Sequence, residues 1–301
     1  MREIVVISGK GGTGKTSLTA AFAFLAENMV LCDADVDAAD LHLIMAPTPR
    51  KREAFMGGGQ AVIDEEKCTQ CGTCRDLCRF EAVTEAFTID EIGCEGCGVC
   101  VDFCPEGAID FPQKRCGEWF ISDTRQGPMV HARLGIAEEN SGRLVTLVRK
   151  EARALAERES RDLIVTDGPP GVGCPVIASI GGATALVIVT EPTVSGLHDM
   201  ERVAELATHF KVPAMVCVNK FDLNPEQTVA IEALAARRNM TVLGRIPFDP
   251  VFTRAMLEGR SVTEFSAEGE ASLAIRDIWK RVMASPVMDK LGIKDLRKIV
   301  K

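Results

Sequence analysis

The chain has 301 residues, 46% of them apolar, so it can form two ordinary domains or one large domain with an insert. Its formal net charge of -8 argues against bulk nucleic-acid binding, which needs a basic face. No apolar run reaches the roughly 18 residues of a membrane span, and the N-terminus lacks a signal-peptide pattern. We therefore expect a cytoplasmic protein, in which 12 cysteines indicate metal or redox chemistry rather than disulfides.

The first 35 residues predict a strand, a glycine-rich loop, a helix and a second strand. The apolar run EIVVIS precedes the loop, TSLTAAFAFLAEN follows it with helical composition, and MVLCDAD is the next strand. Further apolar strands, separated by helix-type segments such as 141–160, are predicted at 162–170, 183–192, 213–222 and 241–249. This alternation predicts an α/β fold with a doubly wound, mostly parallel sheet.

The loop between the first strand and helix, SGKGGTGKTS, contains the phosphate-binding pattern G-x-x-x-x-G-K-[ST]. Its glycines let backbone N–H groups close on phosphate oxygens, Lys15 reaches the β- and γ-phosphates, and the Thr16 hydroxyl can ligate Mg²⁺. The helix N-terminus adds a partial positive charge. The predicted nucleotide-binding residues of this loop are Gly9, Gly11, Gly12, Thr13, Gly14, Lys15, Thr16 and Ser17.

Acidic residues follow two of the predicted strands. Asp33 and Asp35 come just past the second strand, where ligands bind in open α/β sheets, so one can hold Mg²⁺ and the other a water. Asp167 ends a later apolar strand and is predicted as a Mg²⁺ partner of the Walker B type.

A second group of polar residues lies at the end of the segment 213–222, where its apolar run stops. Asn219 and Asp222, in the sequence VNKFD, suggest a loop that recognises the nucleotide base. The segment IPFDP, 246–250, either closes the other side of the base or is an ordinary turn.

The phosphate loop has an additional lysine, Lys10, that an ordinary loop of this type does not need. The motif GKGGTGKT, together with CDADVDAADLHLIM, resembles the MinD/ParA/Mrp superfamily of P-loop ATPases, which includes the nitrogenase iron protein. The resemblance covers roughly residues 1–50 and 140–265. It implies a Mg²⁺-dependent ATPase that forms a homodimer, or a heterodimer with a paralogous ATPase. It also implies that Lys10 reaches the partner's ATP, that Asp35 orients water and that Asp33 lies on the metal side.

Residues 60–112 interrupt the α/β pattern with a cysteine-rich internal repeat. The pattern C-x₂-C-x₂-C-x₃-C occurs twice, and it is typical of two-cluster ferredoxins, in which the fourth cysteine of each run ligates the other cluster. One [4Fe-4S] cluster is thereby assigned to Cys68, Cys71, Cys74 and Cys104. The second is assigned to Cys94, Cys97, Cys100 and Cys78. Structural zinc is the alternative, but two triple-cysteine runs do not fit Cys₄ zinc sites.

The predicted domains are therefore a P-loop ATPase domain split into 1–59 and 113–301, and an inserted ferredoxin domain at 60–112. Residues 116–134 are expected to form a hairpin that returns the chain to the sheet. Arg79 departs from the ferredoxin pattern, because proline usually follows the fourth cysteine, but the ligands stay intact. The whole chain resembles MinD-superfamily ATPases with a ferredoxin insert, some of them labelled cobyrinic acid a,c-diamide synthase-like.

Four cysteines lie outside the repeat. Cys32 and Cys217, in apolar strands, are expected in the core. We expect Cys174 and Cys116 to be two free thiols. The alternative comes from the resemblance, because Cys174 lies seven residues after Asp167, the offset at which the nitrogenase iron protein carries a cluster ligand. It implies an interface cluster at Cys174, for which Cys116 is a candidate companion.

The C-terminal segment 289–301 has five basic residues and several apolar ones. It is expected to be a terminal helix that docks on the core or frays. A MinD-like membrane helix is the alternative, but Gly292 weakens it and no tryptophan or phenylalanine anchors it.

These features together predict a dimeric ATPase that couples its nucleotide state to electron transfer, or to the conformation of a partner, with a redox partner protein and no nucleic acid. Two other functions stay open. One is an iron-sulfur carrier or assembly scaffold of the Mrp type, in which Cys174 holds a transferable cluster. The other is a non-enzymatic, MinD-like positioning switch with redox-sensing clusters.

Overall fold

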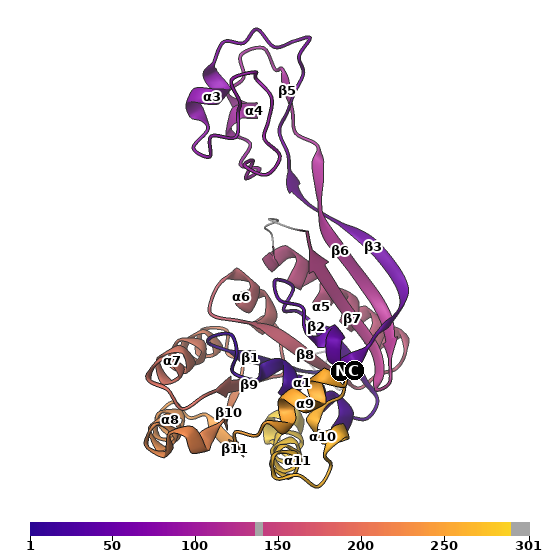
Figure 1. Cartoon of the computed structure of the whole chain (residues 1–301), viewed down its shortest axis with the longest axis vertical. Helices are drawn as coiled ribbons and strands as arrows, with labels where there is room; N and C mark the ends of the chain where they lie inside the picture. Colours follow the sequence, from indigo (N-terminus) through magenta and orange to yellow (C-terminus); the bar gives the residue numbers. More distant parts are fainter. Residues whose placement is uncertain (136–140, 290–301) are drawn as a thin grey trace, which may run out of the picture. The chain divides into compact units, whose positions relative to one another are not determined.

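The computed structural model describes residues 1–135 and 141–289, which form two compact units (Figure 1). The sheet unit comprises residues 1–52, 119–133 and the chain from 141; the cysteine-rich unit comprises 53–118 and the segment from 134. The expected insert at 60–112 lies within the cysteine-rich unit. That unit is longer than the expected insert because it also includes parts of two long strands, β3 (Thr48–Gly59) and β6 (Gln113–Thr124).

A nine-stranded sheet has the order β11-β10-β9-β1-β8-β2-β7-β6-β3. Every neighbouring pair from β11 to β7 is parallel. These strands are β1 (Arg2–Ser8), β2 (Met29–Asp33), β7 (Gly127–Leu134), β8 (Leu163–Pro170), β9 (Ala185–Thr190), β10 (Ala214–Asn219) and β11 (Thr241–Ile246). The predicted doubly wound, mostly parallel sheet is confirmed, and its strand order changes direction beside β1, where open sheets form their ligand crevice.

Helices cover both faces of this sheet, which explains why its strands are apolar throughout. In β1, Ile4 and Val6 pack into the core on one face, and Val5 and Ile7 pack into the core on the other. The first core includes α1 (Lys15–Leu25), α2 (Leu41–Met45), α9 (Val251–Leu257), α10 (Val262–Phe265), α11 (Glu270–Met283) and α12 (Pro286–Asp289). The second includes α6 (Cys174–Ile180), α7 (Val194–His209) and α8 (Pro225–Arg237).

Helix α5 (Ser141–Arg158) confirms the helix predicted at 141–160. Its buried Arg149 donates to the carbonyl oxygens of Ala178 and Gly181 at the end of α6, and to both carboxylate oxygens of Glu3 in β1. One side chain therefore satisfies helix-terminal carbonyls, which have no partner within α6, and joins α5 and α6 to the sheet.

The expected hairpin at 116–134 is also confirmed, as β6 and β7. The Thr124 hydroxyl donates to the carbonyl oxygen of Gly127 (2.7 Å) across the turn between them. Strand β3, at the edge of the sheet, was not predicted. Residues 48–54 are exposed and include Arg50, Lys51 and Arg52, so they lack the apolar pattern of a buried strand, and such charges keep an edge strand from pairing with other chains.

The cysteine-rich unit is small and has few regular elements. Strands β4 (Val62–Ile63) and β5 (Ile109–Asp110) pair in antiparallel fashion. Each copy of the cysteine repeat contains one short helix, α3 (Thr73–Leu77) in the first copy and α4 (Val99–Asp102) in the second. Gly72 and Gly98 precede these helices at φ 88° and 76°, a conformation that favours glycine. The sequence repeat is therefore also a structural repeat. Across the described parts of both units, no helix is long and apolar enough to cross a bilayer.

Candidate nucleotide site and cysteine cavities

The glycine-rich loop joins the end of β1 to the start of α1. Gly14 has φ 88°, and a Cβ atom there would lie 2.4 Å from Nδ2 of Asn219. A Cβ atom at Gly9 would lie 2.3 Å from Cβ of Asp199 in α7. Glycine is therefore favoured at Gly14 by its positive φ and required at Gly9 by close packing against α7. Of the other predicted loop residues, Gly11 and Gly12 are exposed, Thr13 is buried, and Thr16 and Ser17 are half-buried in the first turn of α1.

Lys15 is buried between two of the predicted acidic residues. Its Nζ lies 2.9 Å from Oδ2 of Asp35 and 3.2 Å from Oδ1 of Asp167. The hydroxyl of Thr19, one turn further along α1, also donates to Asp167 (3.0 Å). Burial disfavours the charged amine, but the carboxylates of Asp167 and Asp35 outweigh burial and raise the pKa of Lys15. The structure thus brings the phosphate-loop lysine and the acidic strand ends into one site.

Three carboxylates converge on this site, and each has one buried oxygen without a hydrogen-bond partner: Oδ2 of Asp33, Oδ1 of Asp35 and Oδ2 of Asp167. Burial raises the pKa of Asp33 and of Asp35. Buried oxygens without partners are costly unless a ligand satisfies them, and carboxylate oxygens are the ligands that Mg²⁺ prefers. The residues present therefore fit Mg²⁺, which Asp33, Asp167 and the Thr16 hydroxyl would hold.

Two predicted base-loop residues make contacts within the protein. Asn219 donates through Nδ2 to the carbonyl oxygen of Thr13 (2.8 Å), so the end of β10 supports the phosphate loop. Asp222 accepts a hydrogen bond from the backbone N–H of Phe248 (2.7 Å), which joins the two loops that were expected to flank the base. Their contact with a base stays a prediction.

Lys10 lies within hydrogen-bonding distance of residues that the sequence did not single out. Its Nζ is 2.5 Å from Oε1 of Glu191 and 3.1 Å from Oγ of Ser195. The other oxygen of Glu191 lies 3.2 Å from Nζ of Lys220, which also donates to the carbonyl oxygen of Gly12 (3.1 Å). Glu191 and Lys220 directly follow β9 and β10, so their position at strand ends was the signal that could have identified them.

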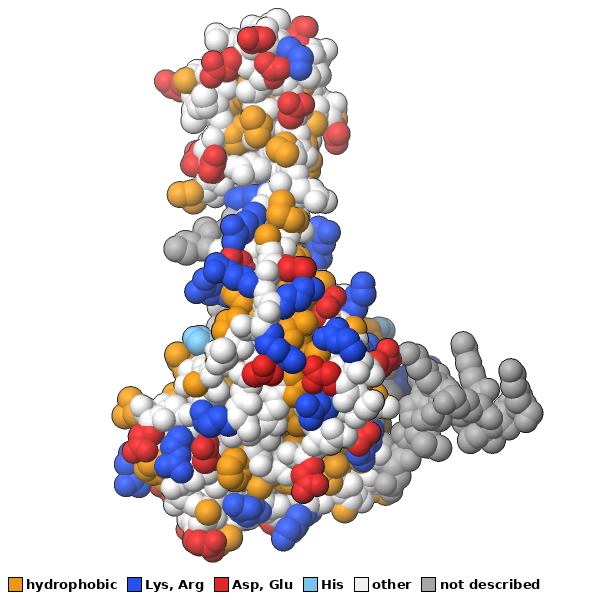
Figure 2. Space-filling model, turned by 90° about the vertical axis from the view of Figure 1, so that its right-hand side faces the viewer, with side chains coloured by type: hydrophobic (Ala, Val, Ile, Leu, Met, Phe, Trp, Pro, Cys, Tyr) orange, Lys and Arg blue, Asp and Glu red, His pale blue; other side chains and the backbone are white. Residues whose placement is uncertain are grey.

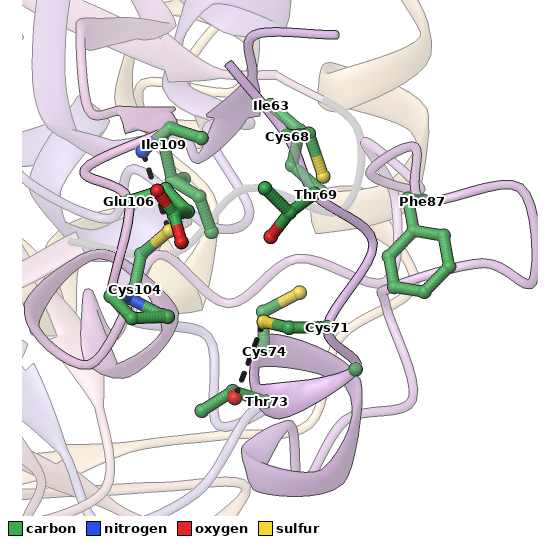
Figure 3. Close-up of a pocket in the computed structure, with 13 residues that line it drawn as sticks. Ile63, Cys68, Thr69, Cys71, Thr73, Cys74, Phe87, Cys104, Glu106 and Ile109 are labelled. Atoms are coloured by element: carbon green, nitrogen blue, oxygen red, sulfur yellow. Dashed lines mark hydrogen bonds between the residues drawn. The ribbon is translucent and has the colours of Figure 1, made fainter.

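The eight cysteines of the repeat line two separate cavities. The first cavity is lined by Cys68, Cys71, Cys74 and Cys104, together with apolar residues such as Ile63, Phe87 and Ile109. In Figure 3 the four thiols lie around one space, with Cys104 reaching it from a different segment than the other three. A hydrogen bond from the Ala108 N–H to Cys104 Sγ (3.3 Å) fixes this fourth thiol.

The second cavity is lined by the other four cysteines, Cys78, Cys94, Cys97 and Cys100. Each cavity thus combines three cysteines of one run with the fourth of the other, as the ferredoxin pattern predicts. Over residues 1–135 and 141–289, no three His, Cys, Asp or Glu side chains are already arranged to hold a metal ion. The thiols surround each cavity without converging on one point.

The remaining cysteines divide into buried and exposed ones. Cys32 and Cys217 are fully buried in the core, as predicted, and burial raises the pKa of the Cys217 thiol to about 12. Cys174 is exposed at the start of α6. Cys116 is buried in the cysteine-rich unit, where its thiol donates to the carbonyl oxygen of Gly57 (2.7 Å). The two cysteines of the predicted interface cluster therefore belong to different units, and the C-terminal segment 290–301 lies outside the described residues.

Comparison with known proteins agrees with this geometry. Residues 4–262 match the family model described as the CobQ/CobB/MinD/ParA nucleotide binding domain. The protein MJ0578 of Methanocaldococcus jannaschii, described as uncharacterised, is 33% identical over 225 residues, 74% of this chain and 79% of that protein. A cytosolic Fe-S cluster assembly factor, the NUBP2 homologue of Trichoplax adhaerens, is 29% identical over 139 residues, 41% of this chain and 52% of that protein.

The fold is also similar to solved structures. The septum site-determining protein MinD of Pyrococcus horikoshii, solved with Mg-ADP, has a TM-score of 0.58 at 18% identity, covering 94% of this chain and 96% of that one. This likeness concerns the fold, whereas the family match spans most of the chain and includes the phosphate loop. The chain therefore belongs to the CobQ/CobB/MinD/ParA nucleotide-binding domain family.

Proposed function

We propose that the protein binds ATP with Mg²⁺ and hydrolyses it. The observation that carries this proposal is the buried group of Lys15, Asp33, Asp35 and Asp167 beside the glycine-rich loop. When bound, Mg²⁺ would neutralise charge on the β- and γ-phosphates. Lys15 would leave Asp35 for the phosphates, and Asp35, with an oxygen already free of hydrogen bonds, would orient the attacking water.

Hydrolysis would require a dimer, formed by two copies of this chain or with a paralogous ATPase. By its resemblance to the deviant phosphate loop, Lys10 would contribute positive charge to the ATP of the partner subunit, as an arginine finger does. Its place at the entrance of the loop, with a side chain that is 31% exposed, supports this role.

Two variants test the dimeric site, because each removes a different contribution. Lys10→Ala would remove the trans lysine and Asp35→Ala the water-orienting carboxylate, so each variant alone should be inactive. In an equal mixture, half of the dimers would be mixed, and one of the two sites in each would be intact. We therefore expect about a quarter of the wild-type ATPase rate. Full activity of Lys10→Ala alone would contradict the trans role.

We infer further that residues 60–112 form an inserted ferredoxin domain with two [4Fe-4S] clusters. The support is that each cavity is apolar and lined by four cysteines from two segments. Each cysteine of a [4Fe-4S] cluster binds a different iron, so the ligands surround a space, whereas zinc ligands converge on one ion at about 2.3 Å. The bound clusters would supply one-electron redox chemistry, and the thiolates together with the apolar lining would hold them.

A redox partner protein would meet this domain beside the second cavity. Leu77, Phe80, Val99 and Phe111 line that cavity and are 37–48% exposed, whereas Ile63, Phe87 and Ile109 of the first cavity are buried or half-buried. Residues 60–112 hold twelve Asp and Glu against three Lys and Arg, a net charge of -9. In Figure 2, acidic side chains surround apolar ones on this unit. An apolar centre with an acidic rim fits a partner with a basic rim.

A second candidate function is the transfer of iron-sulfur clusters. It is favoured by the partial similarity to the NUBP2 homologue, named as a cluster assembly factor, and by the exposed thiol of Cys174. In that case Cys174 would hold a labile cluster, while the insert clusters stay bound.

The two candidates differ in what a cluster-loaded protein does with an apoprotein. Under anaerobic conditions with ATP, the carrier should lose iron to an apo-ferredoxin, and Cys174→Ser should abolish the transfer. The electron-transfer protein should retain about eight irons and eight sulfides throughout. Stoichiometric zinc without sulfide would contradict both.

A further inference from the structure

Glu191 lies between two lysines at the entrance of the phosphate loop. Its side chain is 15% exposed, and its two oxygens contact Nζ of Lys10 at 2.5 Å and Nζ of Lys220 at 3.2 Å. Burial alone would raise the pKa of Glu191, but hydrogen bonds from the two lysines outweigh burial and lower it. The carboxylate is thus charged and shared between both amines.

The amine of Lys10 is fully occupied by its own subunit. Besides Glu191, it donates to Oγ of Ser195 (3.1 Å) and to Oγ1 of Thr193 (3.4 Å), both at the start of α7. The Thr193 hydroxyl is itself held as the N-cap of α7, since it accepts from the Gly196 N–H. Lys10 therefore has to leave a preformed group of acceptors before it can contact a phosphate of another subunit.

Lys220 keeps the carboxylate paired after Lys10 has left. It contacts the second oxygen of Glu191 and the carbonyl oxygen of Gly12 in the loop, so its own position does not depend on Lys10. A partly buried carboxylate that lost its sole partner would carry a large desolvation cost, and Lys220 reduces that cost.

We propose that Glu191 is a positioning residue that holds Lys10 on its own subunit and thereby sets the free energy of ATP-dependent dimerisation. The inference rests on the proposed role of Lys10 in the partner's site. Dimerisation exchanges one anion for another on Lys10: the carboxylate of Glu191 is replaced by the partner's phosphates. The strength of the Glu191 contact therefore opposes dimer formation, and a protein without ATP stays monomeric with Lys10 paired.

The test uses Glu191→Gln, which removes the charge and keeps the shape. With a non-hydrolysable ATP analogue and Mg²⁺, sedimentation should show that the variant dimerises at a lower protein concentration. Loss of a charge-assisted contact should give about a threefold effect per lysine, and a symmetric dimer releases two lysines, so we expect about a tenfold effect on the dimer. Glu201→Gln, on the outer part of α7 and paired with Arg238, is the matched control and should dimerise as the wild type does.

A second measurement follows Lys10 directly in the monomer. Amine acetylation, quantified by mass spectrometry without nucleotide, should be several-fold faster at Lys10 in Glu191→Gln than in the wild type, because Lys10 has lost its strongest partner. Unchanged acetylation at Lys10, or weaker dimerisation of Glu191→Gln, would overturn the inference. Full activity and normal dimerisation of Lys10→Ala would instead refute the trans role itself, so the two failures are distinguishable.

Discussion

Lys15 and Asp35 form a buried ion pair, with Nζ 2.9 Å from Oδ2, where the phosphate loop meets the end of β2. The lysine that the motif assigns to phosphate thus pairs with Asp35, the proposed water-orienting carboxylate, and with Asp167, a proposed Mg²⁺ ligand. Binding of Mg-ATP would be an exchange of partners, in which phosphates take Lys15 and the metal replaces its charge. The buried carboxylates therefore have a positive charge beside them in both states, Lys15 without nucleotide and Mg²⁺ with it.

The first prediction concerns Lys15→Met in the nucleotide-free protein. Without Lys15, three buried carboxylates lose their cation, and removal of one partner from a buried ion pair costs about 3–5 kcal/mol. We expect the free energy of unfolding at pH 7 to fall by about that amount, measured by urea denaturation. ATP binding should also be lost, because a direct phosphate contact is removed. An unchanged unfolding free energy would show that Asp35 and Asp167 are not neutralised by Lys15.

The second prediction is a pH dependence that comes from the raised pKa of Asp33. Because the folded state holds a proton at pH values where the unfolded carboxyl, with a pKa of about 3.9, has lost it, this residue destabilises the fold as pH rises through that interval. As pH rises from 4 to 7, the unfolding free energy of Asp33→Asn should therefore increase relative to that of the wild type. With Mg-ATP bound, the unfolding free energies of the two proteins should change with pH in the same way. Parallel curves without nucleotide would contradict the buried, repulsive environment of Asp33.

Much of the sheet unit could be predicted from the sequence because its strands are buried on both faces. The runs that became β8, β9 and β10 begin with apolar stretches and are buried along almost their whole length, so a buried strand was the assignment that fitted them. The edge strand β3 was missed because exposed Arg50, Lys51 and Arg52 give no apolar periodicity; its pairing with β6 is a tertiary effect.

The candidate site also contains residues that the sequence predicted and residues that it did not. Lys15, Asp33, Asp35 and Asp167 were found because a motif and strand ends locate them locally. Glu191 and Lys220 directly follow β9 and β10 but were missed, because their contacts with Lys10 and with Gly12 join distant segments and belong to no known motif. The shared cysteine cavities were predicted, since the spacing of the repeat itself encodes which thiols meet.

The third prediction tests how cysteines are shared between the cavities. Cys104→Ser should affect the cluster held with Cys68, Cys71 and Cys74, and Cys78→Ser should affect the other, although each serine lies in the opposite run. Anaerobic iron content should fall by up to four atoms in each variant, with different surviving electron paramagnetic resonance signals. Cys174→Ser, which lies outside both cavities, is the control and should keep all eight irons. Identical residual spectra in the two cavity variants would refute the shared assignment.

The fourth prediction concerns the exposed apolar side chains that line the second cavity. Phe80→Ser should slow electron transfer to a basic haem protein, with cytochrome c as the probe, by about tenfold, because it removes an exposed aromatic contact beside the cluster. Phe103→Ser, also exposed in this unit but outside the second cavity, is the matched control. Reduction by dithionite should be equal in all three proteins, and the cytochrome rate should fall with added salt. Equal slowing in both variants would show that the apolar side chains beside the second cavity have no special part in partner binding.

The last prediction is coupling between ATP and the clusters. Asp33 and Asp35 precede β3, which leads into the cysteine-rich unit, so we expect a change at the nucleotide site to act on that unit through the chain segment that joins them. Coupling free energies between sites are typically about 1–3 kcal/mol, and tenfold in a one-electron equilibrium is about 59 mV, so we expect a shift of about 40–130 mV. The measurement is a redox titration with and without a non-hydrolysable ATP analogue. Coupling is reciprocal, so cluster reduction must change ATP affinity by the same factor, and the Lys15→Met variant must abolish both effects. If neither the potential nor the affinity moves, the insert does not gate electrons by nucleotide, and its acidic, apolar surface serves partner docking alone.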